Sequence, residues 1–237
     1  MSALFVAPLA FTDANSPAPI DGTTVGNLNN DKPGYVWRGS LGSASFTIDL
    51  GPDPVEYDTI ALVGSNLRAS DGVRVQTGTT TDVSGYDSGT VAAWAGKKPK
   101  QLSAKTIALL PSIRTDRYVR VTITAPGHPR GYVQAQRLVI GAATRTYGVK
   151  FGAKVNFEDR SPITIGPGFE DVDRYDVLPA WDITTTGITD AAWRETWFPL
   201  LLEVGSSSGL LFVRDNRAPR DLANGCRLWS HHFEGFR

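Results

Sequence analysis

The chain has 237 residues, and its 24 lysines and arginines balance 24 aspartates and glutamates, so the formal net charge is zero. A balanced charge argues against a general nucleic-acid binder, which needs excess cations to displace counterions. A single cysteine, Cys226, excludes an internal disulfide framework and a thiolate zinc cluster. No apolar run reaches the roughly 18 residues of a membrane span. The apolar start lacks the positive flank of a signal peptide, so we expect a protein used without secretion.

The first half of the chain consists of short β-branched segments separated by glycine and proline turns. Residues 58–63 form an almost continuous apolar run, which is typical of a strand covered on both faces. Residues 84–89 have the composition of a solvated loop. The remaining predicted strands cover residues 45–49, 73–77, 105–109, 118–123 and 136–140. Short strands at this spacing indicate an antiparallel sandwich.

The pattern changes near residues 141–144, where we place a boundary between a domain at 1–143 and one at 144–237. The second domain is predicted to be a smaller β-rich unit with one α-helix. Its predicted strands are 147–157, a long strand or bent hairpin over 172–186, and closing strands at 210–213 and 226–233.

The helix is predicted over residues 190–204. Thr189 can cap its start and Gly205 can end it, and we expect Pro199 to kink or split it. One apolar face is formed by Trp193, Trp197, Leu200, Leu201 and Val204.

Several segments of the first half occur in the order seen in one fold family. They are Asp21-Gly22, Trp37, residues 46–51 (FTIDLG), residues 58–62, residues 116–121 (DRYVRV) and residues 136–141. This series resembles the galactose-binding-like, or discoidin-type, jelly roll. We expect Leu50 to face inward, Gly51 to turn the chain, and Trp37 to close one end of the sandwich.

The combination of this jelly roll with the second half is similar to minor tail and distal tail proteins of tailed bacteriophages. The similarity is carried by residues 63–67, 128–132, 136–141 and the terminal segment 212–235, and it extends over the whole chain. It implies a virion protein of the tail tip or baseplate, assembled in the bacterial cytoplasm, with glycan contact as an additional role. Its partners would be copies of itself, tail tube and hub proteins, and host surface glycan.

The sequence contains only weak candidates for catalytic groups. Residues 205–209 (GSSSG) match G-x-S-x-G, but they follow a helix and precede a strand, the reverse of a nucleophile elbow. The adjacent His231 and His232 would point to opposite faces of a strand. The acidic residues Glu170, Asp171, Asp173 and Asp176 fit a solvated turn. We therefore expect no enzyme, no cofactor and no metal site, with an accessory module of a polysaccharide depolymerase as one alternative.

For the polar loops, sugar binding is a stronger hypothesis than catalysis. Glycan sites combine an aromatic ring with amide, carboxylate and guanidinium groups. The candidate residues are Asn27, Asn29, Asn30, Asp31, Tyr35, Asn66 and Arg68. Asn, Asp and Gly also fill ordinary turns, so a structural role stays open. Calcium binding by Asp21 and Asp31 is a weaker alternative.

Assembly is the function that we expect first. Arginine supplies 17 of the 24 cations, and it suits contacts between subunits. The candidate interface residues are Arg214, Arg217, Arg220, Trp229, Phe233 and Phe236. The second domain would form a closed ring around the tail axis, sixfold or, as the alternative, threefold. The competing function is a free-standing, lectin-like carbohydrate-binding module.

Overall fold

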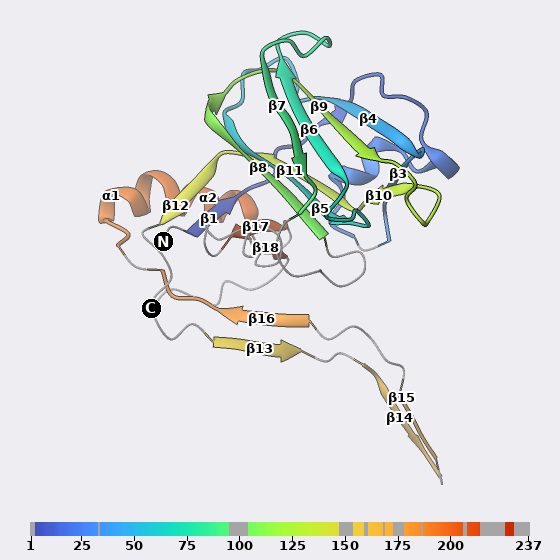
Figure 1. Cartoon of the computed structure of the whole chain (residues 1–237). Coiled ribbons are helices and arrows are strands. Elements are labelled where there is room, and N and C mark those ends of the chain that lie inside the picture. The colour runs from blue at the N-terminus through green and yellow to red at the C-terminus, as the bar shows by residue number, and fades with distance from the viewer. Residues whose placement is uncertain are drawn as a thin grey trace.

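The computed structural model describes residues 3–32, 34–94, 104–146, 154–158, 161–167, 169–172, 178–185, 187–205, 208–213 and 226–229. These residues build three stacked layers of antiparallel sheet, a helix beside the third layer, and an arm that extends away from the layers (Figure 1). The mainly β prediction, with an N-terminal sandwich and one helical segment later in the chain, is confirmed.

The first two layers form the predicted sandwich. The five-stranded sheet has the order β2-β4-β9-β6-β7, and the three-stranded sheet has the order β11-β5-β8. The strands of the first sheet are β2 (Thr12–Asp13), β4 (Gly42–Asp49), β9 (Tyr118–Ala125), β6 (Gly72–Gly78) and β7 (Tyr86–Ala92). Those of the second are β11 (Arg137–Gly141), β5 (Tyr57–Ser65) and β8 (Ala104–Arg114).

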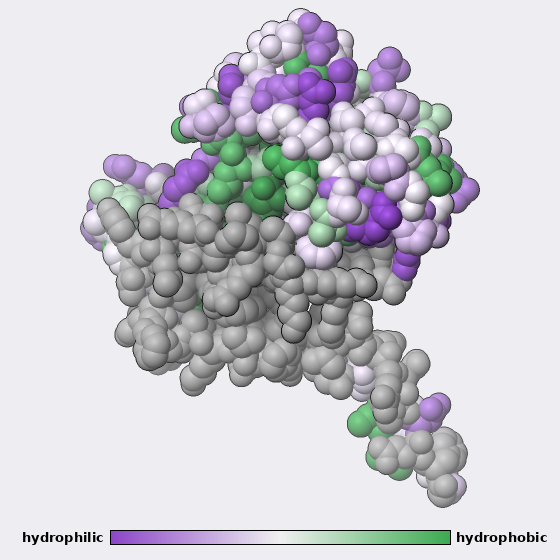
Figure 2. Space-filling view, in the orientation of Figure 1, coloured by the Kyte–Doolittle hydropathy of each residue, from purple (hydrophilic) through white to green (hydrophobic). Residues whose placement is uncertain are grey.

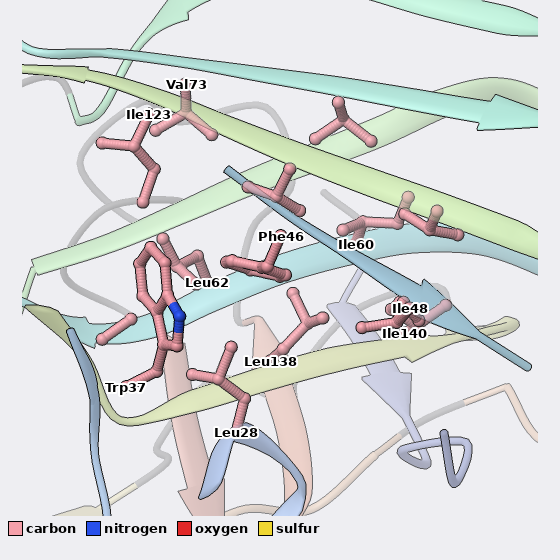
Figure 3. Close-up of a cluster of buried hydrophobic side chains, with 14 of the residues drawn as sticks. Leu28, Trp37, Phe46, Ile48, Ile60, Leu62, Val73, Ile123, Leu138 and Ile140 are labelled. Atoms are coloured by element: carbon pink, nitrogen blue, oxygen red, sulfur yellow. The ribbon is translucent and has the colours of Figure 1, made fainter. Parts of the chain in front are cut away.

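The main core fills the space between these two sheets. Trp37 is 2% exposed, and its ring meets that of Phe46 edge to face, with centroids 4.8 Å apart. Figure 3 shows Trp37 at the edge of this core, beside Leu28 and Leu62. Leu50 is buried in the core and Gly51 follows it with a φ of 98°, so both expectations for the end of β4 are confirmed.

A third sheet covers the outer face of the three-stranded sheet. Its order is β12-β1-β17-β18, with β12 (Ala143–Thr146), β1 (Ala3–Val6), β17 (Leu210–Val213) and β18 (Cys226–Trp229). A second apolar cluster joins the two layers through Leu4, Val6, Ala61, Val63, Val139, Leu211 and Val213. Every residue of β5 is therefore buried, which confirms the prediction of a strand covered on both faces.

The helical segment packs on the other face of this third sheet. It consists of α1 (Asp190–Ala192), the π-helical turn η3 (Trp193–Trp197) and α2 (Phe198–Val204). The hydroxyl of Thr189 accepts a hydrogen bond from the Ala192 N–H, and Gly205 ends the segment, as predicted. Pro199 has no N–H to donate, and the backbone widens into a π turn before it instead of splitting. Trp197 and Val204 are buried against Phe5 and Phe212.

Two nested pairs of antiparallel strands form the extended arm. β13 (Lys154–Glu158) pairs with β16 (Leu178–Asp182), and β14 (Ile163–Gly166) pairs with β15 (Phe169–Val172). Figure 1 shows β14 and β15 at the far end of this arm, pointing away from the sandwich. Of the long strand or bent hairpin predicted over residues 172–186, the described residues hold the end of β15 and the strand β16, which pair with β14 and β13 and not with each other.

Some elements differ from the expectations. Residues 84–89 were expected as a loop, but Tyr86–Ala92 is the edge strand β7, because it completes the ladder of β6. Strands β1, β3 (Trp37–Gly39) and β10 (Val133–Ala135) are not among the predicted strands. β1 comes from the start of the chain and lies between β12 and β17. The domain boundary at residues 143 and 144 stays a prediction.

Candidate functional site

One end of the sandwich carries the loops that contain the predicted sugar-binding residues. We define this loop end as η1 (Ile20–Gly22), η2 (Val25–Asn29), residues 30–36, the turns at 66–71 and 126–132, and the β3–β10 pair. Figure 1 shows β3 and β10 together at this end of the molecule. The loops carry polar groups, and the strands behind them provide a rigid support.

The β3–β10 pair determines which side chains face the core and which face outward. Trp37 and Arg38 are neighbours on β3, so their side chains point to opposite sides. Trp37 enters the core, while Arg38 lies across from Gln134 on β10. A Cβ on Gly39 would lie 2.4 Å from that of Ala44 and 2.7 Å from the Trp37 ring. Gly39 is therefore required by the close approach of the indole.

Arg38 is held in place by three neighbours. Its Nε donates a hydrogen bond of 3.0 Å to Gln134 Oε1, and its guanidinium carbon lies 4.8 Å from the centroid of the Tyr132 ring. One terminal nitrogen is 3.6 Å from a carboxylate oxygen of Asp21, too far for a hydrogen bond. The Asp21 side chain is 71% exposed and that of Arg38 is 30% exposed. The loop end thus presents an oriented guanidinium beside an exposed carboxylate and an aromatic ring.

Three predicted asparagines make hydrogen bonds within the loops. Asn27 Nδ2 donates to the Val36 carbonyl at 2.8 Å, and Asn29 Nδ2 donates to the Phe11 carbonyl at 3.3 Å. Asn30 Oδ1 accepts from the Lys32 N–H at 2.8 Å, which is the pattern of an Asx turn. These contacts shape the loop.

Asp31 is engaged by a buried arginine. Arg137 is 4% exposed, and its Nε lies 3.0 Å from Asp31 Oδ1, at an angle that does not make a hydrogen bond. Arg137 also donates to the Leu28 carbonyl at 3.1 Å and to Asn29 Oδ1 at 3.0 Å. Burial lowers the pKa of Arg137, and the charge of Asp31 opposes that shift. The weaker calcium hypothesis needs this carboxylate, which already faces a cation.

Asn66 and Arg68 hold the neighbouring turn. Asn66 Nδ2 donates to the Tyr132 carbonyl at 3.1 Å, and its Oδ1 accepts from the Gln134 N–H at 2.8 Å. Arg68 forms a two-pronged ion pair with buried Asp71, and this hydrogen bond raises the pKa of Arg68. His128 is 4% exposed, and its Nε2 contacts the Asn66 carbonyl at 3.0 Å. Both predicted residues therefore connect parts of the turn.

Tyr35 is the predicted site residue whose side chain is most open to solvent, with 49% exposure. Tyr35 is thus a surface group, and Arg38 and Tyr132, which are not among the predicted site residues, lie at the same end of the sandwich. The sequence does indicate that Arg38 faces outward: Trp37 is predicted to lie in the core, and the next residue of a strand points to the opposite side. Nothing in the sequence pairs Arg38 with Tyr132, because they are 94 positions apart and meet only through the β3–β10 ladder.

The predicted assembly residues fall almost entirely outside the described residues. Arg214, Arg217, Arg220, Phe233 and Phe236 are among those outside, as are the adjacent histidines, Asp173 and Asp176. For Trp229 the structure describes the backbone, which pairs with Leu210 at the end of β18.

The described part of the chain contains no group of three or more His, Cys, Asp or Glu side chains that could hold a metal ion. Within the same residues, no helix has both the length and the apolar character that crossing a membrane would require.

Comparison with known proteins gives structural similarity alone. No family model and no curated protein matches the sequence. The CBM32-1 module of a family 31 glycoside hydrolase from Clostridium perfringens is 8% identical, with a TM-score of 0.43, over 57% of this chain and 96% of that one. The CBM32 module of AlyQ, solved with 4,5-unsaturated mannuronic acid, is 15% identical with a TM-score of 0.38 over the same shares. A pectin-binding carbohydrate-binding module is 11% identical, with a TM-score of 0.35, over 59% and 94%.

The sandwich fold follows from the strand order and register of this chain itself.

Proposed function

We propose that this protein is a non-catalytic module that contacts carbohydrate through the loop end of its sandwich. The observation that carries the proposal is the arrangement around Arg38. Gln134 and Tyr132 hold the guanidinium in one orientation, so its remaining N–H donors can bind sugar hydroxyls without a large loss of side-chain entropy. Exposed Asp21 supplies hydrogen-bond acceptors, and the half-exposed ring of Tyr35 supplies an apolar face.

The proposal moves the binding role from the loop asparagines to the residues around Arg38. The groups of Asn27, Asn29, Asp31 and Asn66 that contact the protein would have to leave those contacts to bind a ligand, which costs free energy. His128, the histidine within the described residues, is buried and engaged with Asn66, so it is poorly placed to act as a base. The burial of His128 favours binding over catalysis.

The opposite end of the sandwich offers a matched control. Arg117 lies 5.1 Å from the centroid of the Tyr118 ring and pairs with Asp49 at 2.6 Å. It therefore repeats the arginine, tyrosine and carboxylate of the loop end, but at the far ends of β4 and β9.

The test is a glycan array followed by calorimetry, both with the full chain. We expect Arg38→Ala and Tyr35→Ala each to weaken binding of the best glycan by about tenfold or more, the loss of one good polar or stacking contact. Arg117→Ala should leave the affinity unchanged. The proposal fails if the wild-type chain binds no glycan, or if Arg38→Ala binds as well as Arg117→Ala in proteins of equal fold content.

We propose a second function, as a structural component of a bacteriophage tail tip or baseplate, because one observation favours assembly. The arm of β13 to β16 leaves the layered body, and its tip exposes Ile163 and Ile165, which are 59% and 80% accessible. In this reading the chain assembles in the bacterial cytoplasm and then forms a sixfold or threefold ring beside tail tube and hub proteins.

Immunogold electron microscopy of particles from the source tests this second function. We expect label at the end of the tail. Absence of label from every particle, with the protein soluble in the lysate, would contradict the structural role and leave the carbohydrate role standing.

A further inference from the structure

The sequence contains an aspartate followed by glycine at two places, Asp21-Gly22 and Asp71-Gly72, and the fold holds the two pairs very differently. In this dipeptide the glycine nitrogen can attack the aspartate side chain and close a five-membered ring, because glycine has no Cβ to hinder the approach. Ring closure also requires that the carboxyl group and the following peptide rotate. The surrounding structure therefore decides which aspartate can react.

Asp21 has both a free carboxylate and room around its peptide. It lies in η1 at the loop end, and its side chain is 71% exposed. Among the described residues its carboxylate accepts no hydrogen bond, and Arg38 is 3.6 Å away. A Cβ on Gly22 would meet nothing within 4 Å. Figure 2 shows hydrophilic residues at the surface around the place where Figure 1 shows β3 and β10, the strands of the loop end.

Asp71 is held on all sides. Its side chain is fully buried and accepts hydrogen bonds from the N–H, the Nε and an Nη of Arg68. Its own N–H donates to the Arg68 carbonyl at 3.0 Å, and its carbonyl accepts from the Ala93 N–H at 2.8 Å. A Cβ on Gly72 would lie 2.5 Å from the Thr90 methyl carbon. Ring closure at Asp71 would therefore require the fold to open locally.

We propose that Asp21 is a site of spontaneous isoaspartate formation in the folded protein, and that the fold protects Asp71 from the same reaction. The Gly22 nitrogen forms a bond to Cγ of Asp21, and its proton leaves with the carboxyl OH as one water. The resulting succinimide then takes up one water. Hydrolysis at the former main-chain carbonyl gives isoaspartate, and hydrolysis at the other carbonyl restores aspartate. The mass of the chain is unchanged, and no oxidant or cofactor takes part.

The product would alter the turn beside Arg38. In isoaspartate the main chain runs through Cβ and Cγ, and the free carboxylate is attached to Cα. The turn is tied to β3, because the Thr23 hydroxyl donates to the Ile20 carbonyl and accepts from the Arg38 N–H at 3.0 Å. The reaction therefore displaces the carboxylate that Asp21 holds near the Arg38 guanidinium. The modification itself does not depend on the carbohydrate function proposed above.

The experiment ages the full chain in neutral buffer at physiological temperature, folded in one sample and denatured by guanidinium chloride in another. Peptide mapping with electron-transfer fragmentation locates isoaspartate at each position. Location is needed because Asn224-Gly225 also yields isoaspartate, by deamidation, with an increase in mass. The matched variant is Asp21→Glu, which keeps a carboxylate but does not readily close a five-membered ring. Circular dichroism compares the folding of this variant with that of the wild type.

In the folded wild type we expect isoaspartate at residue 21 to exceed that at residue 71 by about tenfold or more, because reaction at Asp71 needs local opening. In the denatured chain the two positions should convert to a similar extent, because each is then an aspartate before a glycine in an open chain. Asp21→Glu should abolish the signal at residue 21 and leave that at residue 71 unchanged.

Two results would overturn the inference. If Asp21 stays unchanged in the folded chain while it converts in the denatured chain, the turn protects it and it is not a modification site. If Asp21 and Asp71 convert equally in the folded chain, the fold does not select between them.

Discussion

The carboxylate of Asp31 contacts Arg137 and the backbone of Gly209, and so connects three parts of the molecule. One of its oxygens lies 3.0 Å from Arg137 Nε on β11, and the other accepts a hydrogen bond of 3.2 Å from the Gly209 N–H, just before β17. The loop after η2, the three-stranded sheet and the third sheet are therefore joined at one side chain. This position explains why an aspartate in a polar loop has a structural role.

Removal of the buried cation should destabilise the fold strongly. Arg137→Met would leave the Leu28 carbonyl and Asn29 Oδ1 without their donor and Asp31 without its neighbouring positive charge. We therefore expect a loss of about 3 kcal/mol in the free energy of unfolding. Urea unfolding followed by tryptophan fluorescence measures it. The matched control is Arg194→Met, whose arginine is 76% exposed in its pair with Asp190 and should cost less than about 0.5 kcal/mol. Equal midpoints for the two variants would contradict this role.

Gly39 should not tolerate even a methyl group. A Cβ there would lie within 3 Å of Ala44 and of the Trp37 ring, so Gly39→Ala should cost about 1–3 kcal/mol by overpacking. Gly26→Ala is the control, because its Cβ would meet only the Thr24 hydroxyl, at 3.6 Å. Thermal unfolding of both variants checks the difference. A Gly39→Ala protein that melts with the wild type would show that the indole can move.

Acid should weaken the five-stranded sheet first. A hydrogen bond from Arg117 lowers the pKa of Asp49, and one from Arg74 lowers the pKa of Asp87 to about 2. Both carboxylates have lower pKa values folded than unfolded, where the reference is 3.8. Their contribution is therefore fully present above pH 4 and is lost as the pH falls toward 2.

Unfolding by urea at several pH values tests this dependence. The stability of the wild type should fall between pH 4 and 2, and Asp49→Asn should flatten part of that slope. A slope unchanged in Asp49→Asn would mean that this carboxylate does not respond to folding.

Trp197 should account for much of the attachment of the helical segment to the third sheet. It is 5% exposed and meets the Phe5 ring edge to face at 5.1 Å. Trp197→Ala should cost about 3–5 kcal/mol, the usual range for a buried tryptophan. Leu202→Ala, on the exposed side of α2, should stay within about 0.5 kcal/mol of the wild type. Faster hydrogen exchange of residues 190–204 in Trp197→Ala would place the loss of stability in the helical segment. Equal exchange in both variants would contradict this role of Trp197.

The candidate site could be predicted from the sequence only as a region. Loop composition placed it at residues 26–35 and near Asn66, and these segments do lie at one end of the sandwich. The hydrogen bonds of each side chain were not readable, because an asparagine in a turn has the same local signature whether it faces a ligand or a carbonyl 18 positions away, as Asn29 does. Arg38 and Tyr132 meet through strand pairing, which leaves no mark in either segment.

The sequence by itself determined what depends on neighbours along the chain. Alternation placed Leu50 inside, the apolar run 58–63 required cover on both faces, and Thr189 and Gly205 bounded the helical segment. Only the tertiary structure decided which strand supplies that cover. β1 lies beside β17, about 200 residues away, because the outer faces of β5 and β11 and the inner faces of these two strands bury one another. Hydrophobic burial is non-directional. The sequence therefore shows that the outer face of β5 must be covered, and the packed fold decides which strands cover it.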